Sequence, residues 1–283
     1  MNEELAIARE HYQAAITDSD ALLSRVSAAL SRTDAAMSPE SLARFDQFHI
    51  GGLAATARMA EGLALSADAH LLDAGSGLGG PSRFLAQRFS CQVTGVDIAP
   101  VYVAIARLLA EKADVAGRVS YLVGSITELP FAPATFDAVC TQHVVMNVRD
   151  RVAAYREIRR VLRPGGRFAF YDPYVPEGAL PPHYPTPWAE SAANSTLLTE
   201  QETRVCLAQA GLRLRSWDDV SEVANGWIAQ QQRQIAQPTD TRPDQSPNLA
   251  WVLGPRMQPM VANYARNIQE GRIRLVMGFG EAS

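Results

Sequence analysis

Short runs of apolar residues alternate with longer amphipathic segments through the middle of the chain. Five apolar runs predict buried parallel strands, over 70–75, 91–98, 119–124, 136–142 and 166–173. Helical patterns lie between them, over 81–89, 99–117 and 150–162, and the RPGG stretch at 163–166 is expected to end the last helix. Strands and helices that alternate at this spacing indicate βαβ units, and therefore an α/β fold with a doubly wound sheet.

The two flanks of this region have a different pattern. Residues 1–65 are mostly helical in pattern, which predicts an N-terminal cap before an α/β domain over 66–283. The segment 174–196 is too rich in proline for regular structure, and it is expected, with 222–268, to be inserted as a lid or cap. A helix over 198–211 and strands over 213–219 and 271–282 are expected to complete the sheet, with a polar loop over 237–248.

The composition limits the classes of partner that are expected. The formal net charge of −4 gives no basic footprint, so a nucleic-acid partner is not expected. The 3 cysteines are scattered singly, which is typical of a reduced cytoplasm. No apolar run approaches the ~20 residues that span a bilayer, and the N-terminus lacks the apolar region of a signal peptide. A cytoplasmic protein without a membrane partner is expected.

The stretch LLDAGSGLGGPSRFLA, residues 71–86, fits a G-x-G-x-x-G turn that begins at Gly75. Such a turn between a strand and a helix lets a ligand approach the backbone closely. Asp73 precedes it, and a carboxylate there would oppose the pyrophosphate of NAD. The same acid would suit the sulfonium and ammonium groups of S-adenosylmethionine (SAM). In the alternative interpretation, Asp73 only caps local backbone amides.

Asp97 is expected to end the second strand, about twenty residues after the glycines. An acid at this place can accept both ribose hydroxyls of a nucleoside cofactor. NAD and SAM both need this contact, so Asp97 does not discriminate between them. As an alternative, Asp97 is the N-cap of the following helix.

The stretch VGSITELPFAPATFDAVCTQHVVMNV, residues 123–148, together with the glycine turn and VLRPGG, resembles the class I SAM-dependent methyltransferases over about 66–220. The stretches DQFHIGG, TQHVVMNVRDR and FAFYDP resemble the small-molecule branch that includes the sarcosine and dimethylglycine N-methyltransferases. Where that branch usually has S-Q-D, this chain has Thr141, Gln142 and His143, so the glycine-betaine substrate is not carried over.

The resemblance implies a Rossmann-like, mostly parallel seven-stranded sheet, with SAM as cofactor and S-adenosylhomocysteine (SAH) as product. In the family, an acid precedes the glycine turn and the residues after the third strand flank adenine. The expected cofactor-binding residues are Gln47, Asp73, Gly75, Ser76, Gly77, Asp97, Ile98, Ser125, Ile126 and Gln142. The family often has Asp at the position of Ser125.

Methyl transfer from a sulfonium is an in-line displacement that needs alignment and, for a protonated acceptor, a base. His143 follows the fourth strand, at the edge where open α/β sheets bind ligands, and it is the first candidate for that base. Alternatively, it packs against the cofactor or bonds to the backbone. His49 in DQFHIGG is the second candidate. No cluster of residues suggests a metal, and none is expected.

Aromatic residues gather in and after the fifth strand, where the long loop 174–196 is expected to form the acceptor pocket. The expected substrate-binding residues are Tyr171, Tyr184, Trp188 and, in the N-terminal cap, Tyr12; Tyr174 belongs to the same aromatic group. In the alternative interpretation these rings only fasten an irregular loop to the core.

The function expected from the resemblance is SAM-dependent methyl transfer to a small-molecule acceptor, at nitrogen, carbon or oxygen. Two other classes stay open: a SAM-fold protein without methyl transfer, such as a cyclase or a binding module, and an NAD-dependent oxidoreductase. The small molecule is the expected partner, and a homodimer is left open.

Overall fold

A computed structural model describes residues 19–32, 36–47, 49–236, 250–254 and 257–282. Its centre is a sheet of seven strands in the order β3-β2-β1-β4-β5-β7-β6. The strands are β1 (His70–Ala74), β2 (Gln92–Asp97), β3 (Val119–Val123), β4 (Phe136–Gln142), β5 (Leu162–Tyr174), β6 (Leu212–Asp219) and β7 (Arg274–Ala282). β7 pairs antiparallel with both of its neighbours, β5 and β6, and the other pairs of adjacent strands are parallel. The mostly parallel α/β sheet expected from the sequence is confirmed.

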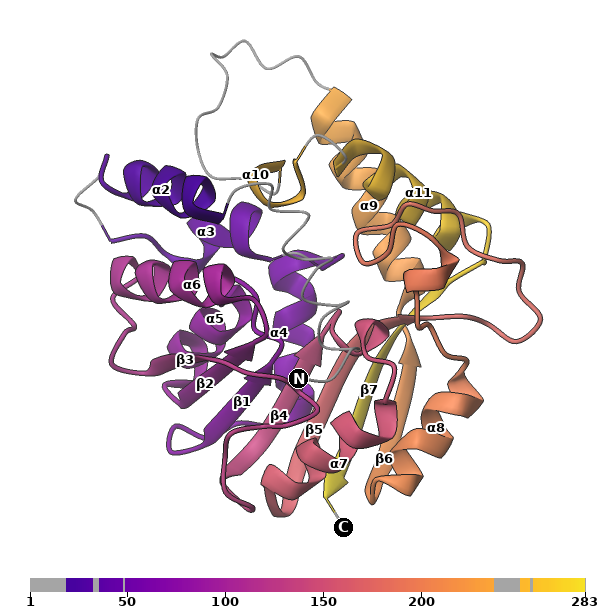
Figure 1. The fold of residues 1–283 in the computed structure, drawn as a ribbon, viewed down its shortest axis with the longest axis horizontal. Coiled ribbons are helices and arrows are strands. Elements are labelled where there is room, and N and C mark those ends of the chain that lie inside the picture. The colour runs from indigo at the N-terminus through magenta and orange to yellow at the C-terminus, as the bar shows by residue number, and fades with distance from the viewer. Residues whose placement is uncertain (1–18, 33–35, 48, 237–249, 255–256, 283) are drawn as a thin grey trace.

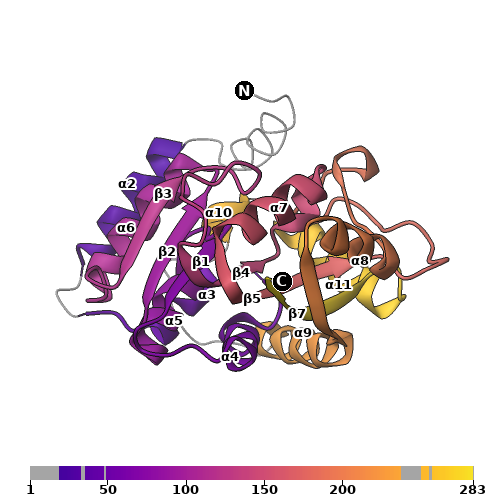
Figure 2. The same cartoon turned by 90° about the horizontal axis from the view of Figure 1, so that it is seen from below.

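Helices cover both faces of the sheet (Figures 1 and 2). One face carries α4 (Gly52–Leu63), α5 (Gly80–Phe89) and α6 (Pro100–Lys112), and the other carries α7 (Arg151–Val161) and α8 (Glu200–Gln209). Successive strand residues serve opposite faces: Leu71 packs in one core cluster and Leu72 in the other. This double burial explains why the strands read as continuous apolar runs.

The remaining helices lie toward the carboxyl ends of the parallel strands (Figure 1). They are α2 (Ser19–Leu30), α3 (Pro39–Asp46), α9 (Ser221–Ala236), α10 (Ala250–Leu253) and α11 (Met257–Gln269). The segment 174–196 contains an isolated bridge between Thr186 and Ala189 and the short 3₁₀ helix η2 (Ala192–Asn194). These elements surround the edge at which an open α/β sheet binds ligands.

Two predicted boundaries were wrong. The helix expected over 99–117 ends at Lys112, because Asp114 adopts a left-handed φ of 55° that a helix cannot include. The RPGG stretch lies inside β5 and does not end α7, which stops at Val161. Leu162 is already extended and pairs with Phe136, so the strand begins before Pro164. The loop expected over 237–248 lies outside the described residues.

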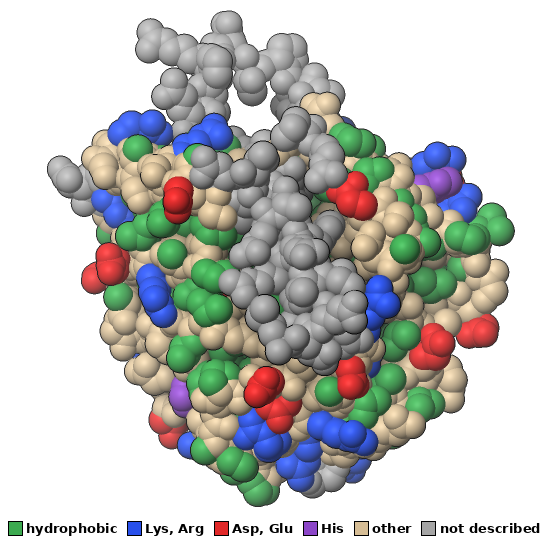
Figure 3. Space-filling view, viewed as in Figure 1, with side chains coloured by type: hydrophobic (Ala, Val, Ile, Leu, Met, Phe, Trp, Pro, Cys, Tyr) green, Lys and Arg blue, Asp and Glu red, His purple; other side chains and the backbone are tan. Residues whose placement is uncertain are grey.

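Two features of the structure concern possible partners: the distribution of charge on the surface, and the length and polarity of the helices. On the face in Figure 3, acidic and basic side chains lie interspersed among apolar and polar ones. Within the described ranges, every helix is too short or too polar to cross a bilayer.

Candidate functional site

The strand order reverses direction between β1 and β4, so the loops that follow these two strands meet at one point of the carboxyl edge. The contact is close: a Cβ added to Gly75, after β1, would lie 2.3 Å from a methyl carbon of Val144, after β4. Gly75 and Ser76 both donate their backbone N–H groups to the carbonyl of Val96 at the end of β2. The glycine turn and the His143 loop therefore form one site.

Glycine is required in the turn itself. Gly75, Gly77 and Gly79 have φ values of 90°, 52° and 75°, which L side chains rarely adopt. The turn leads directly into α5, so its backbone lies at a helix N-terminus. The hydroxyl of Ser76 is buried and has no hydrogen-bond partner among the described residues.

Asp97 ends β2 and joins two turns. One carboxylate oxygen accepts from Gly77 N at 2.8 Å, and the other accepts from Ala99 N at 2.9 Å, just before α6. A carboxylate has about four acceptor sites, so two remain for ligand hydroxyls. The alternative that Asp97 is the N-cap of the following helix is wrong, because the N-cap of α6 is Ala99. Ile98 beside it is partly exposed.

Asp73 is only 1% exposed and is held inside the protein. Its carboxylate accepts from the Ser82 hydroxyl at 2.5 Å and faces the Cys140 thiol at 3.8 Å. Burial raises the pKa of Asp73 to about 6, and the nearby Asp97 adds to the effect. Asp73 thus ties β1 to the first turn of α5.

Two residues after β3 were expected to flank adenine. Ser125 forms a turn in which its hydroxyl lies 2.8 Å from that of Thr127, and its backbone pairs with Glu128. Ile126 is 9% exposed and packs in the core on the α7 side of the sheet. This turn follows the end of β3, two strands away from β1.

A buried polar group lies where α4 meets β4. The Thr56 hydroxyl is at its centre, 3.0 Å from Gln47 Oε1, 3.2 Å from Gln142 Oε1 and 3.1 Å from His49 Nε2. The amide nitrogens of Gln47 and Gln142 are buried and have no partner among the described residues. Two unpaired amide donors at one place suit an anionic ligand group such as a carboxylate.

His143 follows β4 in a strained conformation, with a φ of 55°. Its backbone N–H donates to the carbonyl of Tyr171, and its Nε2 lies 2.7 Å from the Tyr264 hydroxyl of α11. Its Nδ1 is buried without a partner in the described structure. Burial lowers the pKa of His143 well below its ordinary value, and His49 contributes to this shift.

His49 lies beside His143, with ring centroids 5.9 Å apart. Its Nε2 lies 3.0 Å from the carbonyl oxygen of Gly52. Burial lowers the pKa of His49 to about 4. Both imidazoles are therefore neutral at neutral pH, and each keeps one N–H and one nitrogen lone pair.

Aromatic rings surround the two histidines. Tyr171 packs edge-on against both, and its hydroxyl donates to the carbonyl of Ile50 at 3.0 Å. Trp188 is 2% exposed and lies 4.8 Å from the ring of Tyr264. Tyr184 is partly buried against the core cluster that contains Trp188 and Tyr264. Tyr12 lies outside the described residues.

Hydrogen bonds attach the proline-rich segment to α11. Asn267 accepts from His183 N at 2.7 Å and donates to His183 O at 2.9 Å, and Asn263 donates to Pro185 O at 3.0 Å. The segment that carries Trp188 and the helix that carries Tyr264 are therefore held together, and both rings are positioned at the site by the same packing. Tyr174 points elsewhere, since its hydroxyl bonds to Asp219 and its ring packs on Trp217.

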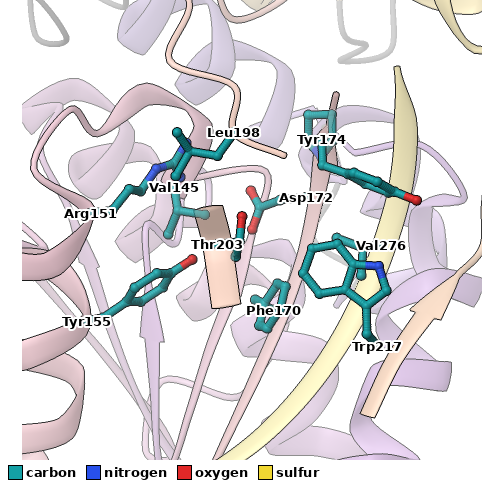
Figure 4. A pocket seen from close by; sticks show the side chains of 11 residues that line it. Val145, Arg151, Tyr155, Phe170, Asp172, Tyr174, Leu198, Thr203, Trp217 and Val276 are labelled. Carbon is teal, nitrogen blue, oxygen red and sulfur yellow. The ribbon is translucent and has the colours of Figure 1, made fainter. Parts of the chain in front are cut away.

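Asp172 follows Tyr171 in β5 and serves the opposite face of the sheet. Figure 4 shows its carboxylate beside Thr203, in a pocket of about 10 Å³ that Arg151 and Trp217 also line, enough for roughly one water molecule. One oxygen of Asp172 accepts from Val144 N at 2.9 Å, and burial raises the pKa of this carboxyl to about 7. Asp172 therefore supports the His143 loop from behind.

Three residues that build the site, Thr56, Tyr264 and Arg83, lie in no motif that would identify them from the sequence. Thr56 is an ordinary position in an amphipathic helix, and Tyr264 lies 121 residues from His143 along the chain. Arg83 forms an ion pair of 2.6 Å with Asp46, and both side chains are at most 1% exposed. An Arg and an Asp at completely buried positions are visible only once the fold is known. This pair fixes α3, which precedes Gln47, against α5.

The reversed strand order, the glycine turn and the acid that ends β2 are features of an α/β domain with the class I methyltransferase fold. A family model described as a methyltransferase domain matches residues 72–170. These residues are a methyltransferase domain, and the resemblance drawn from the sequence is confirmed.

Known proteins agree with this assignment. The chain is 31% identical to the O-methyltransferase resE of Aspergillus sclerotiorum over 56% of its own length and 61% of that protein. It is 31% identical to the sarcosine/dimethylglycine N-methyltransferase of Halorhodospira halochloris over 42% of its own length and 44% of that protein. The chain thus spans less than two thirds of these relatives, and the likeness concerns the shared domain.

Solved structures share the fold. The geranyl diphosphate C-methyltransferase of Streptomyces coelicolor A3(2), solved with SAH, has a TM-score of 0.64 and 17% identity, covering 81% of this chain and 79% of that one. The [4+2]-cyclase SpnF has a TM-score of 0.65 and 22% identity, covering 92% of this chain and 93% of that one. At these identities the likeness concerns the fold alone.

Proposed function

We propose that this protein is a SAM-dependent methyltransferase that acts on a small-molecule acceptor. The observation that carries the proposal is the junction of the methyltransferase domain, residues 72–170, with the unpaired amide donors of Gln47 and Gln142. These donors suit the carboxylate of the methionine part of SAM.

The other cofactor contacts are proposed on the same grounds. The backbone of the glycine turn, with Gly75, Ser76 and Gly77, allows close approach, and Asp97 keeps acceptor sites for two ribose hydroxyls. Ile98, Ser125 and Ile126 would flank the adenine, and Asp73 would act at a distance as a buried acid. When bound, SAM supplies the electrophilic methyl group. The protein supplies alignment and a water-poor site.

The acceptor side is proposed to be the aromatic region around the two histidines. His143 and His49 are the proposed catalytic residues, and Tyr171, Tyr184 and Trp188 are proposed to contact the acceptor; Tyr12 is proposed from the sequence alone. Residues 1–65, 174–196 and 222–268 are proposed to cap this side. A cytoplasmic location and a homodimer remain part of the proposal.

Calorimetry with SAM and SAH, followed by a panel of small alcohols, phenols, amines and carbon acids scored by SAH release, tests the function. We expect both cofactors to bind and at least one acceptor class to release SAH. An affinity for NAD greater than that for SAH would contradict the proposal.

A second candidate function is a SAM-fold protein without methyl transfer. It is favoured by the likeness to the [4+2]-cyclase SpnF, which covers 92% of this chain. This candidate predicts SAH binding without SAH release from SAM under every acceptor. The panel therefore separates the two candidates.

A further inference from the structure

The small pocket behind the His143 loop lies on the face of the sheet that carries α7 (Figure 4). Two charged side chains line it, and both are deeply buried: Asp172 of β5 is 4% exposed, and Arg151, at the start of α7, is 6% exposed. A buried charge is costly unless it is paired and hydrogen-bonded, so each of these groups needs partners for all of its polar atoms.

The protein itself satisfies each charge only in part. Asp172 Oδ1 accepts from Val144 N at 2.9 Å, whereas Oδ2 is buried and has no partner among the described residues. Arg151 donates from Nη2 to the carbonyl oxygen of Thr196 at 2.6 Å, whereas its buried Nε–H has no partner in the described part of the chain. One acceptor and one donor are therefore left over on two side chains that line the same pocket.

The two side chains do not reach each other. Within the ranges that the structure describes, Asp172 and Arg151 form neither an ion pair nor a hydrogen bond with one another. When two polar groups line one space without touching, a water molecule between them is the usual bridge. The pocket of about 10 Å³ has the volume of one such molecule.

The chemistry of the two atoms selects the occupant. A carboxylate oxygen only accepts a hydrogen bond and a guanidinium N–H only donates one, so the occupant must donate to Asp172 and accept from Arg151. A cation would be repelled by Arg151 and an anion by Asp172, and an organic molecule exceeds the volume. Water meets both requirements, and holding it costs less than leaving two buried polar groups unpaired.

We propose that this pocket is a binding site for a single water molecule, which donates a hydrogen bond to Asp172 Oδ2 and accepts one from Arg151 Nε–H. The water completes the pairing of the two buried charges without direct contact between them. The site goes beyond the proposed function, because it needs neither a cofactor nor an acceptor.

The water joins two supports of the candidate site. Asp172 holds the backbone of Val144, in the loop after β4, and Arg151 holds the backbone of Thr196, at the end of the segment 174–196. These two attachments are separate in the protein hydrogen bonds, and the water links them. The loop after β4 and the end of this segment therefore share one buried anchor.

The same two parts of the chain also meet through side chains. Trp188 of the segment 174–196 packs on Tyr264 with ring centroids 4.8 Å apart, and the Tyr264 hydroxyl lies 2.7 Å from Nε2 of His143. The aromatic contact and the water site thus restrain the same pair of segments at two separate points. Loss of the water should loosen the backbone after His143 while the aromatic contact remains.

A crystal structure of the full chain, at a resolution that shows ordered water, tests the site directly. We expect one water within about 2.7–3.2 Å of both Asp172 Oδ2 and Arg151 Nε. A dry pocket, a water that contacts only one of the two atoms, or a direct contact between Arg151 and Asp172 would overturn the proposal.

Filling the pocket tests its importance for the fold. Val276 of β7 lines the pocket and lies directly opposite Asp172 in the sheet, so Val276→Ile adds one carbon where the water binds. This carbon cannot replace the hydrogen bonds of the water. We expect the midpoint of denaturant unfolding to fall. We also expect hydrogen exchange of the Val144 amide to speed up by about tenfold relative to that of Leu72, as for the loss of one hydrogen bond to a charged group.

Val161→Ile is the matched control for crowding. Val161 of α7 is fully buried in the same core cluster but does not line the pocket. It should therefore leave the ratio of Val144 to Leu72 exchange unchanged, whatever its effect on the midpoint. In a dry pocket the added carbon of Val276→Ile improves the packing. A midpoint at or above that of the parent would therefore contradict a bound water, and so would an equal change of the exchange ratio in both variants.

Discussion

The two halves of the site are built over very different distances along the chain. In the cofactor half, Asp97 bonds to Gly77 across 20 residues, and both belong to one βαβ unit. The other half lies under the helices that cover the strand ends, where Thr56 bonds to Gln142 across 86 residues and His143 bonds to Tyr264 across 121. Functional residues that belong to one local unit are close together in the sequence and form a recognisable motif. Functional residues that come from distant segments are single polar residues in the sequence and form no motif.

The largest effect is expected where the halves are joined. Arg83→Met removes one partner of the buried ion pair with Asp46, and it should lower the free energy of unfolding by about 3–5 kcal/mol. Denaturant unfolding measures this, and SAH affinity and turnover should fall together. The double variant Asp46→Leu/Arg83→Met is the control and should recover part of the loss, since no unpaired charge is left. A single variant that is as stable as the parent would show that the halves are not joined here.

The pH dependence of the free energy of unfolding should have opposite signs for the buried groups on the two faces of the sheet. The pKa of His49 falls from 6.5 to about 4 on folding, so the unfolded state binds more protons between these values. Stability from this group therefore falls as pH drops from 6.5 to 4, by about 3 kcal/mol at about 1.4 kcal/mol per pKa unit. The parent should lose this amount relative to His49→Gln in denaturant unfolding. His143, which flanks His49, should act in the same direction.

Asp172 on the other face supplies the opposite sign. Its pKa rises from 3.8 to about 7, so the folded state binds more protons in that window and the parent loses stability as pH rises through it. The Arg151 guanidinium opposes this shift only in part. Relative to Asp172→Asn, the parent should therefore be more stable at pH 4 than at pH 8. Parallel pH profiles for both variants would contradict the assignment of opposite shifts.

A cofactor-half change should leave the acceptor half intact. Asp97→Ala removes the acceptor for two backbone N–H groups and for ribose, and it should weaken SAH by roughly 1.5–3 kcal/mol in calorimetry. Asp97→Asn, which keeps one acceptor oxygen, should lose less. Unchanged SAH affinity in Asp97→Ala would remove Asp97 from the cofactor site.

The smallest effect is expected at the shared hydroxyl. Thr56→Val keeps the shape of a fully buried side chain but removes the group between Gln47, Gln142 and His49. SAH affinity should fall by about 0.5–1.5 kcal/mol, the usual net value of a hydrogen bond. Thr203→Val, on α8, is the matched control. A loss confined to turnover would place Thr56 in the acceptor half alone.

Most of the fold was predictable because the central strands β1, β2 and β4 are buried on both faces along most of their length. Four of the five strands of the central run lie within one residue of their apolar stretches, while β5 starts earlier because Leu162 pairs with Phe136. The glycine turn was predictable because its positive φ values require glycine. His143 and His49 could be named as candidates from their places beside the strand end and the turn, but their hydrogen-bond partners could not, since the contacts with Tyr264 and Gly52 are set by packing.

The sequence by itself determined the order of strands and helices, the turn after β1 and the acid at the end of β2. These depend on local periodicity and on backbone conformations that few residues allow. Only the tertiary structure decided that Thr56 joins two glutamines, that Arg83 pairs with Asp46 inside the core, and that Tyr264 of α11 reaches His143. The physical reason is that a hydrogen bond depends on distance in space, and helices packed over the end of a sheet bring together residues that no sequence spacing connects.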